Sequence, residues 1–206
     1  MRIFLRLWML LYLSGTAWAM DAVPVVEESP SIVERSTLMP GFMPLYWDAE
    51  EGRLYGDIDG LTGPFIYYNG LSHGVGSNDL GLDRGRLGDT HLATLDRVGK
   101  KVFLTAVNTK YTARSENAAE RRAVDEAFAQ SIIWGFEVAE QSEGRTLIDL
   151  TDFALSDATD LSRLLAARGE GSYAIDSSRS AIHLSKTKSF PDNTEIDARL
   201  TYAGNP

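Results

Sequence analysis

The chain has 206 residues, no cysteine and a formal net charge of −9, from 20 Lys and Arg against 29 Asp and Glu. Without cysteine, disulfides, thiolate catalysis and cysteine-ligated zinc sites are excluded. The acidic balance, with no basic patch to offset it, argues against nucleic acid and anionic lipid as partners.

The first nineteen residues have the pattern of a secretory signal peptide. Arg2 and Arg6 precede an apolar run over residues 7–13, and Ala17-Trp18-Ala19 supplies a small-residue cleavage site. The run is too short to span a bilayer. We therefore expect an exported protein, either periplasmic, associated with the outer envelope or secreted, with no membrane segment after cleavage. Residues 20–38 predict an acidic linker, so that a single domain occupies residues 39–206.

The first half of this domain contains several strand candidates. Residues 45–47 and 53–55 flank a polar loop that ends in glycine, which predicts a hairpin, and residues 64–68 predict a third strand. Residues 70–88 contain six glycines and predict a shaped loop. Residues 91–98 and 101–111 form the strongest hairpin pattern, turning at Gly99-Lys100, and the second arm is apolar on both faces like a central strand.

The clearest helix pattern covers residues 116–130. Ser115 can cap it, and one apolar stripe contains Ala123, Val124, Ala127 and Phe128. Residues 145–153 predict a strand and residues 160–168 a short helix. Residues 173–175 and 181–184 predict a hairpin, and residues 195–202 a final strand with strict alternation. The expected fold class is α+β: a mainly antiparallel sheet with one prominent helix and a short second helix.

No segment carries a strong catalytic or metal-binding motif. Asn78, Asp79 and Asp83 have the oxygen-rich composition of a calcium loop without the EF-hand spacing, and a network of Asx turns is the favoured alternative. With Arg84 they form the loop of interest. The glycines spell no dinucleotide or nucleophile-elbow motif. Histidines occur at positions 73, 91 and 183 without H-E-x-x-H spacing, and a metal site built from all three is disfavoured. We therefore assign no catalytic, cofactor-binding or metal-binding residue.

Aromatic residues near the strands leave one binding function open. Tyr46, Trp47, Tyr55, Tyr67 and Tyr68 could stack against sugars, although alternating aromatics in strands more often belong to a core. A glycosidase-like pair of carboxylates also stays open, because 29 acidic residues offer many pairs.

Four blocks of sequence together carry a family resemblance. They are GFMPLYWD (41–48), GSNDLGLDRGRLG (76–88), VDEAFAQSIIWGF (124–136), and SSRS (177–180) leading to KSFPDNTE (188–195). In this order, over residues 39–202, the chain resembles the N-terminal region, of unknown function, of exported bacterial zinc-dependent metalloproteases of the metzincin-like kind. In that family the zinc and its H-E-x-x-H helix lie in a later domain.

The resemblance implies that this chain is the front piece of such a protease, as a fragment or a truncated gene product. It implies no cofactor on this chain, with zinc and its activated water in the absent catalytic domain. The expected partner is that C-terminal metalloprotease domain, which the chain would dock on or shape as a non-catalytic accessory domain. The loop from Gly70 to Gly88 would reach the neighbour, and Asp79 or Asp83 could approach the metal. The alternatives are an independent binding module for glycan or peptide, and a free-standing hydrolase using acid pairs.

Overall fold

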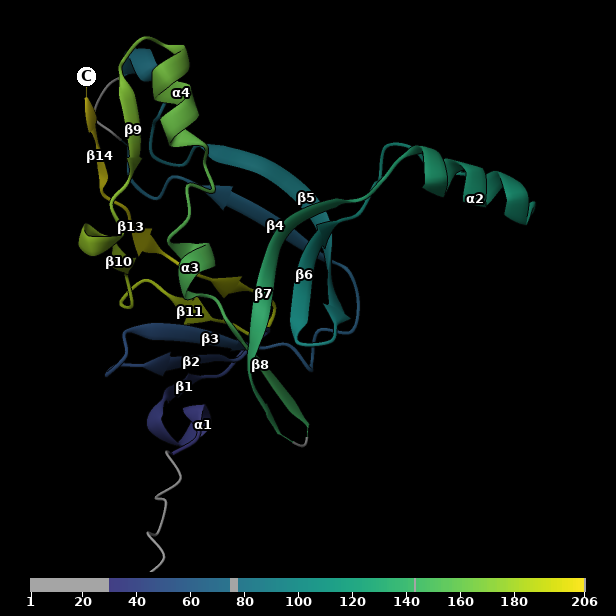
Figure 1. The fold of residues 1–206 in the computed structure, drawn as a ribbon, viewed down its shortest axis with the longest axis horizontal. Helices are drawn as coiled ribbons and strands as arrows, with labels where there is room; N and C mark the ends of the chain where they lie inside the picture. Colours follow the sequence, from purple (N-terminus) through teal and green to yellow (C-terminus); the bar gives the residue numbers. More distant parts are fainter. Residues whose placement is uncertain (1–29, 75–77, 143, 206) are drawn as a thin grey trace, which may run out of the picture.

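The computed structural model describes residues 30–74, 78–142 and 144–205. The predicted signal peptide and most of the predicted linker lie outside these residues. The main element is an antiparallel sheet of eight strands curled into a half-barrel (Figure 1). Its strands are β1 (Thr37–Met39), β2 (Leu45–Asp48), β3 (Arg53–Asp57), β4 (Phe65–Gly70), β5 (Leu87–Val98), β6 (Lys101–Ala106), β7 (Ser131–Ser142) and β8 (Arg145–Asp149). Their order across the sheet is β1-β2-β3-β8-β7-β6-β5-β4.

Two of the three predicted hairpins are confirmed. Strands β2 and β3 pair with Asp48 opposite Arg53, and β5 and β6 pair with Val98 opposite Lys101. Gly99, in the second turn, has a φ of +63°, a left-handed backbone conformation that glycine adopts without a Cβ clash. Strand β6 lies inside the sheet with buried residues on both faces, as its apolar pattern predicts. Strand β5 begins at Leu87, inside the segment expected to be a loop.

Strand β7 is the longest of the elements that the sequence analysis missed, and it gives the sheet its curl. Its first half pairs with β6 and its second half with β8. The register shifts between Leu104 and Thr105 of β6 and between Val138 and Glu140 of β7. Such bulges bend a strand and increase its twist, so β7 turns from one part of the sheet to the other.

The expected α+β fold class is wrong, because the described part of the chain is mostly β. Its α-helices are α1 (Ile32–Arg35), α2 (Ala118–Ala127), α3 (Thr151–Ala154) and α4 (Leu161–Ala167), with 3-10 turns at η1 (Asn78–Leu80) and η2 (Ser177–Arg179). The predicted prominent helix is shorter than expected and buries none of its residues, so it adds no layer to the sheet. It begins after Asn117, whose side chain accepts from Ala119 N–H at 2.9 Å, rather than after Ser115. Among the described helices, none has the length and apolar character to cross a membrane.

The C-terminal third pairs differently from the prediction. Strand β9 (Ser172–Ile175) pairs with β14 (Tyr202–Asn205), and β10 (Ala181–Ile182) pairs with β13 (Ala198–Arg199). A third pair joins β11 (Lys188–Ser189) to β12 (Thr194–Glu195). The predicted hairpin between residues 173–175 and 181–184 is therefore wrong, and the predicted final strand is divided among three short ones. These segments return across the open side of the half-barrel (Figure 1).

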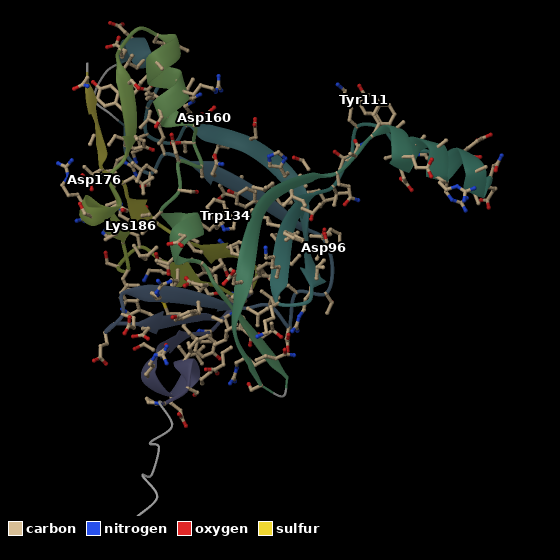
Figure 2. All side chains as sticks on the ribbon, in the orientation of Figure 1. Asp96, Tyr111, Trp134, Asp160, Asp176 and Lys186 are labelled. Carbon is tan, nitrogen blue, oxygen red and sulfur yellow. The ribbon has the colours of Figure 1, made fainter. Side chains whose placement is uncertain are left out.

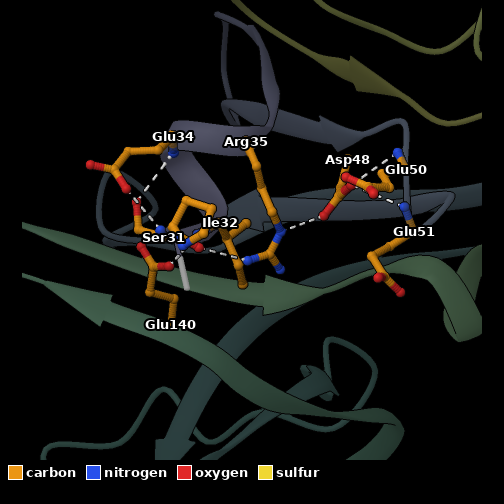
Figure 3. Close-up of polar contacts among 9 residues, drawn as sticks. Ser31, Ile32, Glu34, Arg35, Asp48, Glu50, Glu51 and Glu140 are labelled. Atoms are coloured by element: carbon orange, nitrogen blue, oxygen red, sulfur yellow. Dashed lines mark hydrogen bonds and ion pairs between the residues drawn. The ribbon is translucent and has the colours of Figure 1, made fainter. Parts of the chain in front are cut away.

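The sheet has an apolar cluster on each face. The main core contains Leu45, Leu54, Ala93, Val102, Leu104, Phe136, Ile148 and Leu150. The second cluster joins Tyr46, Tyr55 and Leu147 to Ile32 of α1. Figure 3 shows how α1 is fixed there: Ser31 and Glu34 form a capping box, and Ile32 N–H donates to Glu140 Oε2 at 2.5 Å. The ordered part of the domain thus extends into residues that we expected to belong to the linker.

An ion pair with a buried carboxylate also anchors α1. Arg35 Nε donates to Asp48 Oδ2 at 2.6 Å, and the Asp48 side chain is 1% exposed (Figure 3). The other carboxylate oxygen of Asp48 accepts from the backbone N–H groups of Glu50 and Glu51. The hydrogen bond from Arg35 and the one from Glu51 N–H lower the pKa of Asp48, since both favour its charged form.

Candidate functional site

A large cavity lies between the concave face of the sheet and the returning C-terminal segment. It has a volume of about 1300 Å³. Strands β4, β5 and β6 contribute apolar side chains to its wall, among them Phe65 and Leu95, and α3 contributes Phe153. The opposite wall comes from residues 185–200, including Ser185 and Ile196. The cavity is therefore apolar on the sheet side and more polar on the C-terminal side.

A second cavity of about 570 Å³ adjoins the first along Tyr67 and Phe153. Its wall has aromatic and charged members, including Trp134, Asp160 and Arg163. Trp134 and Asp160 are both labelled in Figure 2, on β7 and at the start of α4. Volumes of roughly 300–1,000 Å³ are typical of small-ligand sites, so this cavity has the size for a ligand.

Phe153 of α3 is the centre of an aromatic cluster between the two cavities. Its ring centroid lies 5.8 Å from Tyr67, 5.5 Å from Trp134 and 5.3 Å from Phe136. Tyr67 also stacks on His91, with 6.4 Å between centroids and 12° between planes. Burial raises the pKa of the Tyr67 hydroxyl, which therefore stays protonated at neutral pH.

The aromatic residues considered as a sugar platform do not lie together. Tyr46 and Tyr55 are buried in the cluster beneath α1, and Trp47 packs against the main core. Tyr68 is 54% exposed and lines the larger cavity, and Tyr67 is the one of the five that lines both cavities. The sequence analysis missed the ring partners that Tyr67 has in the structure, Phe153 and His91.

The loop of interest folds back on the domain. Asn78 and Asp79 belong to η1, while Asp79, Asp83 and Arg84 are exposed. Arg168, just after α4, donates to Asp79 O at 2.7 Å, and Leu82 is buried with 1% exposure. These contacts hold the loop against the chain, so the described part does not extend freely toward a neighbour. Within the described residues, no group of three or more His, Asp and Glu side chains could hold a metal ion.

The three histidines lie apart from one another. His73 is exposed in the loop, His91 lies on β5 against Tyr67, and His183 follows β10. His183 has a polar network, and its partners Ser185 and Asp197 line the C-terminal wall of the large cavity. Its Nδ1 donates to Asp197 Oδ1 at 2.8 Å, and Ser185 Oγ lies 3.0 Å from its Nε2. Arg199 Nη2 lies 3.1 Å from the same Nε2.

Sequence reasoning identified His183 but not Ser185 or Asp197. The register of β10 and β13, with Ile182 opposite Ala198, places His183 opposite Asp197. The predicted hairpin paired residues 181–184 with residues 173–175 instead, so it did not bring His183 close to Asp197. Asp197 could have been found as the partner of His183 only if the pairing of β10 with β13 had been known.

Two comparisons returned no match: neither a curated protein nor a solved structure is similar to the chain. The third comparison found a family. Residues 85–206 match the family described as "Domain of unknown function (DUF5117)", and the match covers more than half of the chain. It includes strands β5 to β14 and the His183 network.

Proposed function

We propose, from the premise that this chain belongs to the DUF5117 family, that it is an accessory domain which docks on the catalytic domain of an exported zinc-dependent metalloprotease. The family description assigns no activity, so the protease part of this proposal is supported by the sequence resemblance over residues 39–202. Export is supported by the signal-peptide pattern of residues 1–19. In this proposal, zinc and its ligands belong to the catalytic domain.

The observation that carries the docking proposal is the arm, residues 108–130, which joins β6 to β7. Figure 1 shows its helix α2 pointing away from the sheet and from the other helices. None of the residues of α2 is buried, although Ala123, Val124 and Ala127 give it an apolar stripe. An isolated helix this short is marginal in water, because most helical stability in proteins comes from packing an apolar face. The stripe is therefore the surface that a partner domain would cover.

The base of the arm is held in place before any partner binds. Tyr111, labelled in Figure 2 where the arm leaves the sheet, stacks on Phe128 with 4.0 Å between ring centroids and 11° between planes. The Lys110 side chain adds a cation–π contact, with Nζ 5.2 Å from the centroid of the Tyr111 ring. A fixed base presents α2 in one direction, which lowers the conformational cost of docking.

Binding between this chain and the catalytic domain of a full-length relative would test the docking proposal. Ala123→Glu places a carboxylate in the apolar stripe, where docking would bury it without a partner, and we expect at least roughly tenfold weaker binding. Ala118→Glu is the matched control, because it makes the same exchange on the opposite face of the same helix. Equal affinities for the two variants and the unchanged chain would refute docking through the stripe.

The second candidate function is glycan binding in the cavity of about 570 Å³. The observation that favours it is an aromatic wall, with Tyr67 and Trp134, next to carboxylates such as Asp160. Aromatic faces stack on sugar rings while acidic groups accept hydrogen bonds from hydroxyls. Titration of the chain with soluble oligosaccharides, followed by Trp fluorescence, should show saturation that Asp160→Asn weakens. A linear, unsaturable response would refute it.

A further inference from the structure

We propose that Ser185, His183 and Asp197 form a nucleophilic site that hydrolyses carboxylic esters with an apolar acyl group. Asp197 contacts one nitrogen of the His183 ring at 2.8 Å, and the Ser185 hydroxyl contacts the other at 3.0 Å. This is the connectivity of a Ser-His-Asp triad, which recurs on unrelated folds and is recognised by geometry rather than by position in the sequence. The inference goes beyond the docking role, which needs no chemistry in this chain.

The hydrogen bonds of His183 fix the tautomer that a general base needs. The Asp197 carboxylate can only accept, so Nδ1 carries the proton that it receives at 2.8 Å. Arg199 Nη2, at 3.1 Å from Nε2, can only donate, so Nε2 must present its lone pair. Nε2 has a single lone pair, which the Ser185 hydroxyl and Arg199 share as donors, so Nε2 removes the Ser185 proton only when Arg199 gives up its contact.

The turn that carries Ser185 is held by the backbone around it. His183 N–H donates to Asp197 O at 2.8 Å, which extends the β10–β13 ladder by one residue. The Thr187 hydroxyl, in a residue with 1% exposure, accepts from Asp197 N–H at 3.1 Å and reaches the carbonyl of His183 at 3.4 Å. Lys186 N–H donates to His183 O at 3.0 Å. These contacts pre-organise the acid and the base, a condition for efficient catalysis.

The acid and the base are shielded from water while the nucleophile is accessible, as the proposed reaction requires. The side chains of His183 and Asp197 are each 15% exposed, so their contact is largely shielded from water. Ser185 is exposed and lines the large cavity (Lys186, next to it in the chain, is labelled in Figure 2). The Arg199 cation contacts the same nitrogen as the hydroxyl, so it lies close to the position where negative charge would develop on a carbonyl oxygen.

The cavity determines the class of substrate. Its sheet-side wall is apolar, with Phe65, Leu95 and Phe153 facing a volume of about 1300 Å³. An apolar acyl chain would lose its contact with water there, which favours binding by roughly 0.8 kcal/mol for each buried methylene group. We therefore expect esters of medium-length aliphatic acids to be better substrates than acetates.

The proposed reaction has two steps. In the first, Nε2 of His183 takes the Ser185 proton while Oγ forms a bond to the ester carbonyl carbon; the carbon–oxygen ester bond then breaks, and the leaving alcohol takes the proton from Nε2. In the second, water gives a proton to Nε2 and its oxygen bonds to the acyl carbon. The bond to Oγ breaks, Ser185 recovers the proton, and the carboxylic acid is released.

The test uses the full purified chain with p-nitrophenyl butyrate and, separately, a fluorophosphonate probe. We expect hydrolysis above the buffer rate, labelling at Ser185 found by mass spectrometry, and at least roughly tenfold loss in Ser185→Ala and His183→Ala. Ser178→Ala is the matched control, since Ser178 is an exposed serine bonded to Asp176 without a histidine and should leave the rate unchanged.

Several results would overturn the site. Hydrolysis by Ser185→Ala at the rate of the unchanged chain would show that Ser185 is not the nucleophile. Absence of labelling at Ser185, or equal labelling at Ser178, would show a structural hydrogen-bond network instead. A thermal melt separates loss of activity from loss of fold, because the exposed Ser185 side chain should not alter the melting temperature when truncated. None of these outcomes depends on docking to another domain.

Discussion

Replacing Phe153 by alanine should strongly destabilise the domain, because it removes the centre of the aromatic cluster. Three aromatic rings converge on Phe153, with centroids 5.3 to 5.8 Å away. Truncation of a buried phenylalanine costs about 3–5 kcal/mol, and Phe153 is only half-buried. We therefore expect a loss near the lower end, about 3 kcal/mol of the free energy of unfolding. With an m-value of about 2 kcal/mol/M, the urea midpoint should fall by roughly 1.5 M.

Trp134 supplies the assay, because its ring lies 5.5 Å from Phe153 and its fluorescence should report unfolding of the concave face. The control is Phe128→Ala at the end of α2. Phe128 is 39% exposed and its ring contact in the structure is the Tyr111 stack, which corresponds to about 1 kcal/mol or less. A Phe153→Ala midpoint shift below roughly 0.5 M, or equal shifts for both variants, would refute the role of Phe153 as the centre of the cluster.

Two further predictions concern carboxylates. Tyr202→Phe removes a hydroxyl that donates to Asp157 Oδ1 at 2.7 Å, and should cost about 1.5 kcal/mol in urea denaturation; an unchanged midpoint would contradict this. The pKa of Asp157 is lowered because hydrogen bonds from Ser162 N–H and Tyr202 outweigh the effect of burial, and that of Asp48 is lowered chiefly by Arg35. A lowered folded-state pKa adds stability above the ordinary value of 3.8 that is lost as the pH falls through the folded value. The melting temperature should therefore drop on acidification below about pH 5, and less steeply in Asp48→Asn; parallel curves would contradict the linkage.

The local elements of the first half were predictable because adjacent strands form their own hairpins. The β2–β3 and β5–β6 pairs need only a turn and an apolar pattern, and both features can be recognised in a continuous stretch of sequence. Strand β7 was also readable in principle: Trp134, Phe136 and Val138 alternate toward the interior while Gly135 and Glu137 face out. It was missed because the sequence analysis assigned no element between the predicted helix at 116–130 and the predicted strand at 145–153.

The C-terminal pairings were not predictable in the same way. Alternation tells which side chains share a face, but not which strand lies alongside. Strands β9 and β14 are separated by η2 and four short strands, so their pairing depends on tertiary contacts such as the one from Tyr202 to Asp157. The same limit applies to the candidate site. His183, Ser185 and Asp197 come together through the β10–β13 register, and no sequence motif predicts that they lie close together.

The half-barrel leaves β4 at the rim of the sheet, paired with β5 alone among the described strands. Leu92 O accepts from Val107 N–H, so the backbone of Leu92 faces β6, and that of Ile66 opposite it faces outward. Ile66 is also 72% exposed. An exposed, apolar edge strand with unpaired backbone groups is a template to which a second molecule can add its own strand. Concentrated preparations of the chain should thus be prone to polymerise rim to rim, and a lysine in place of Ile66 should keep them dispersed.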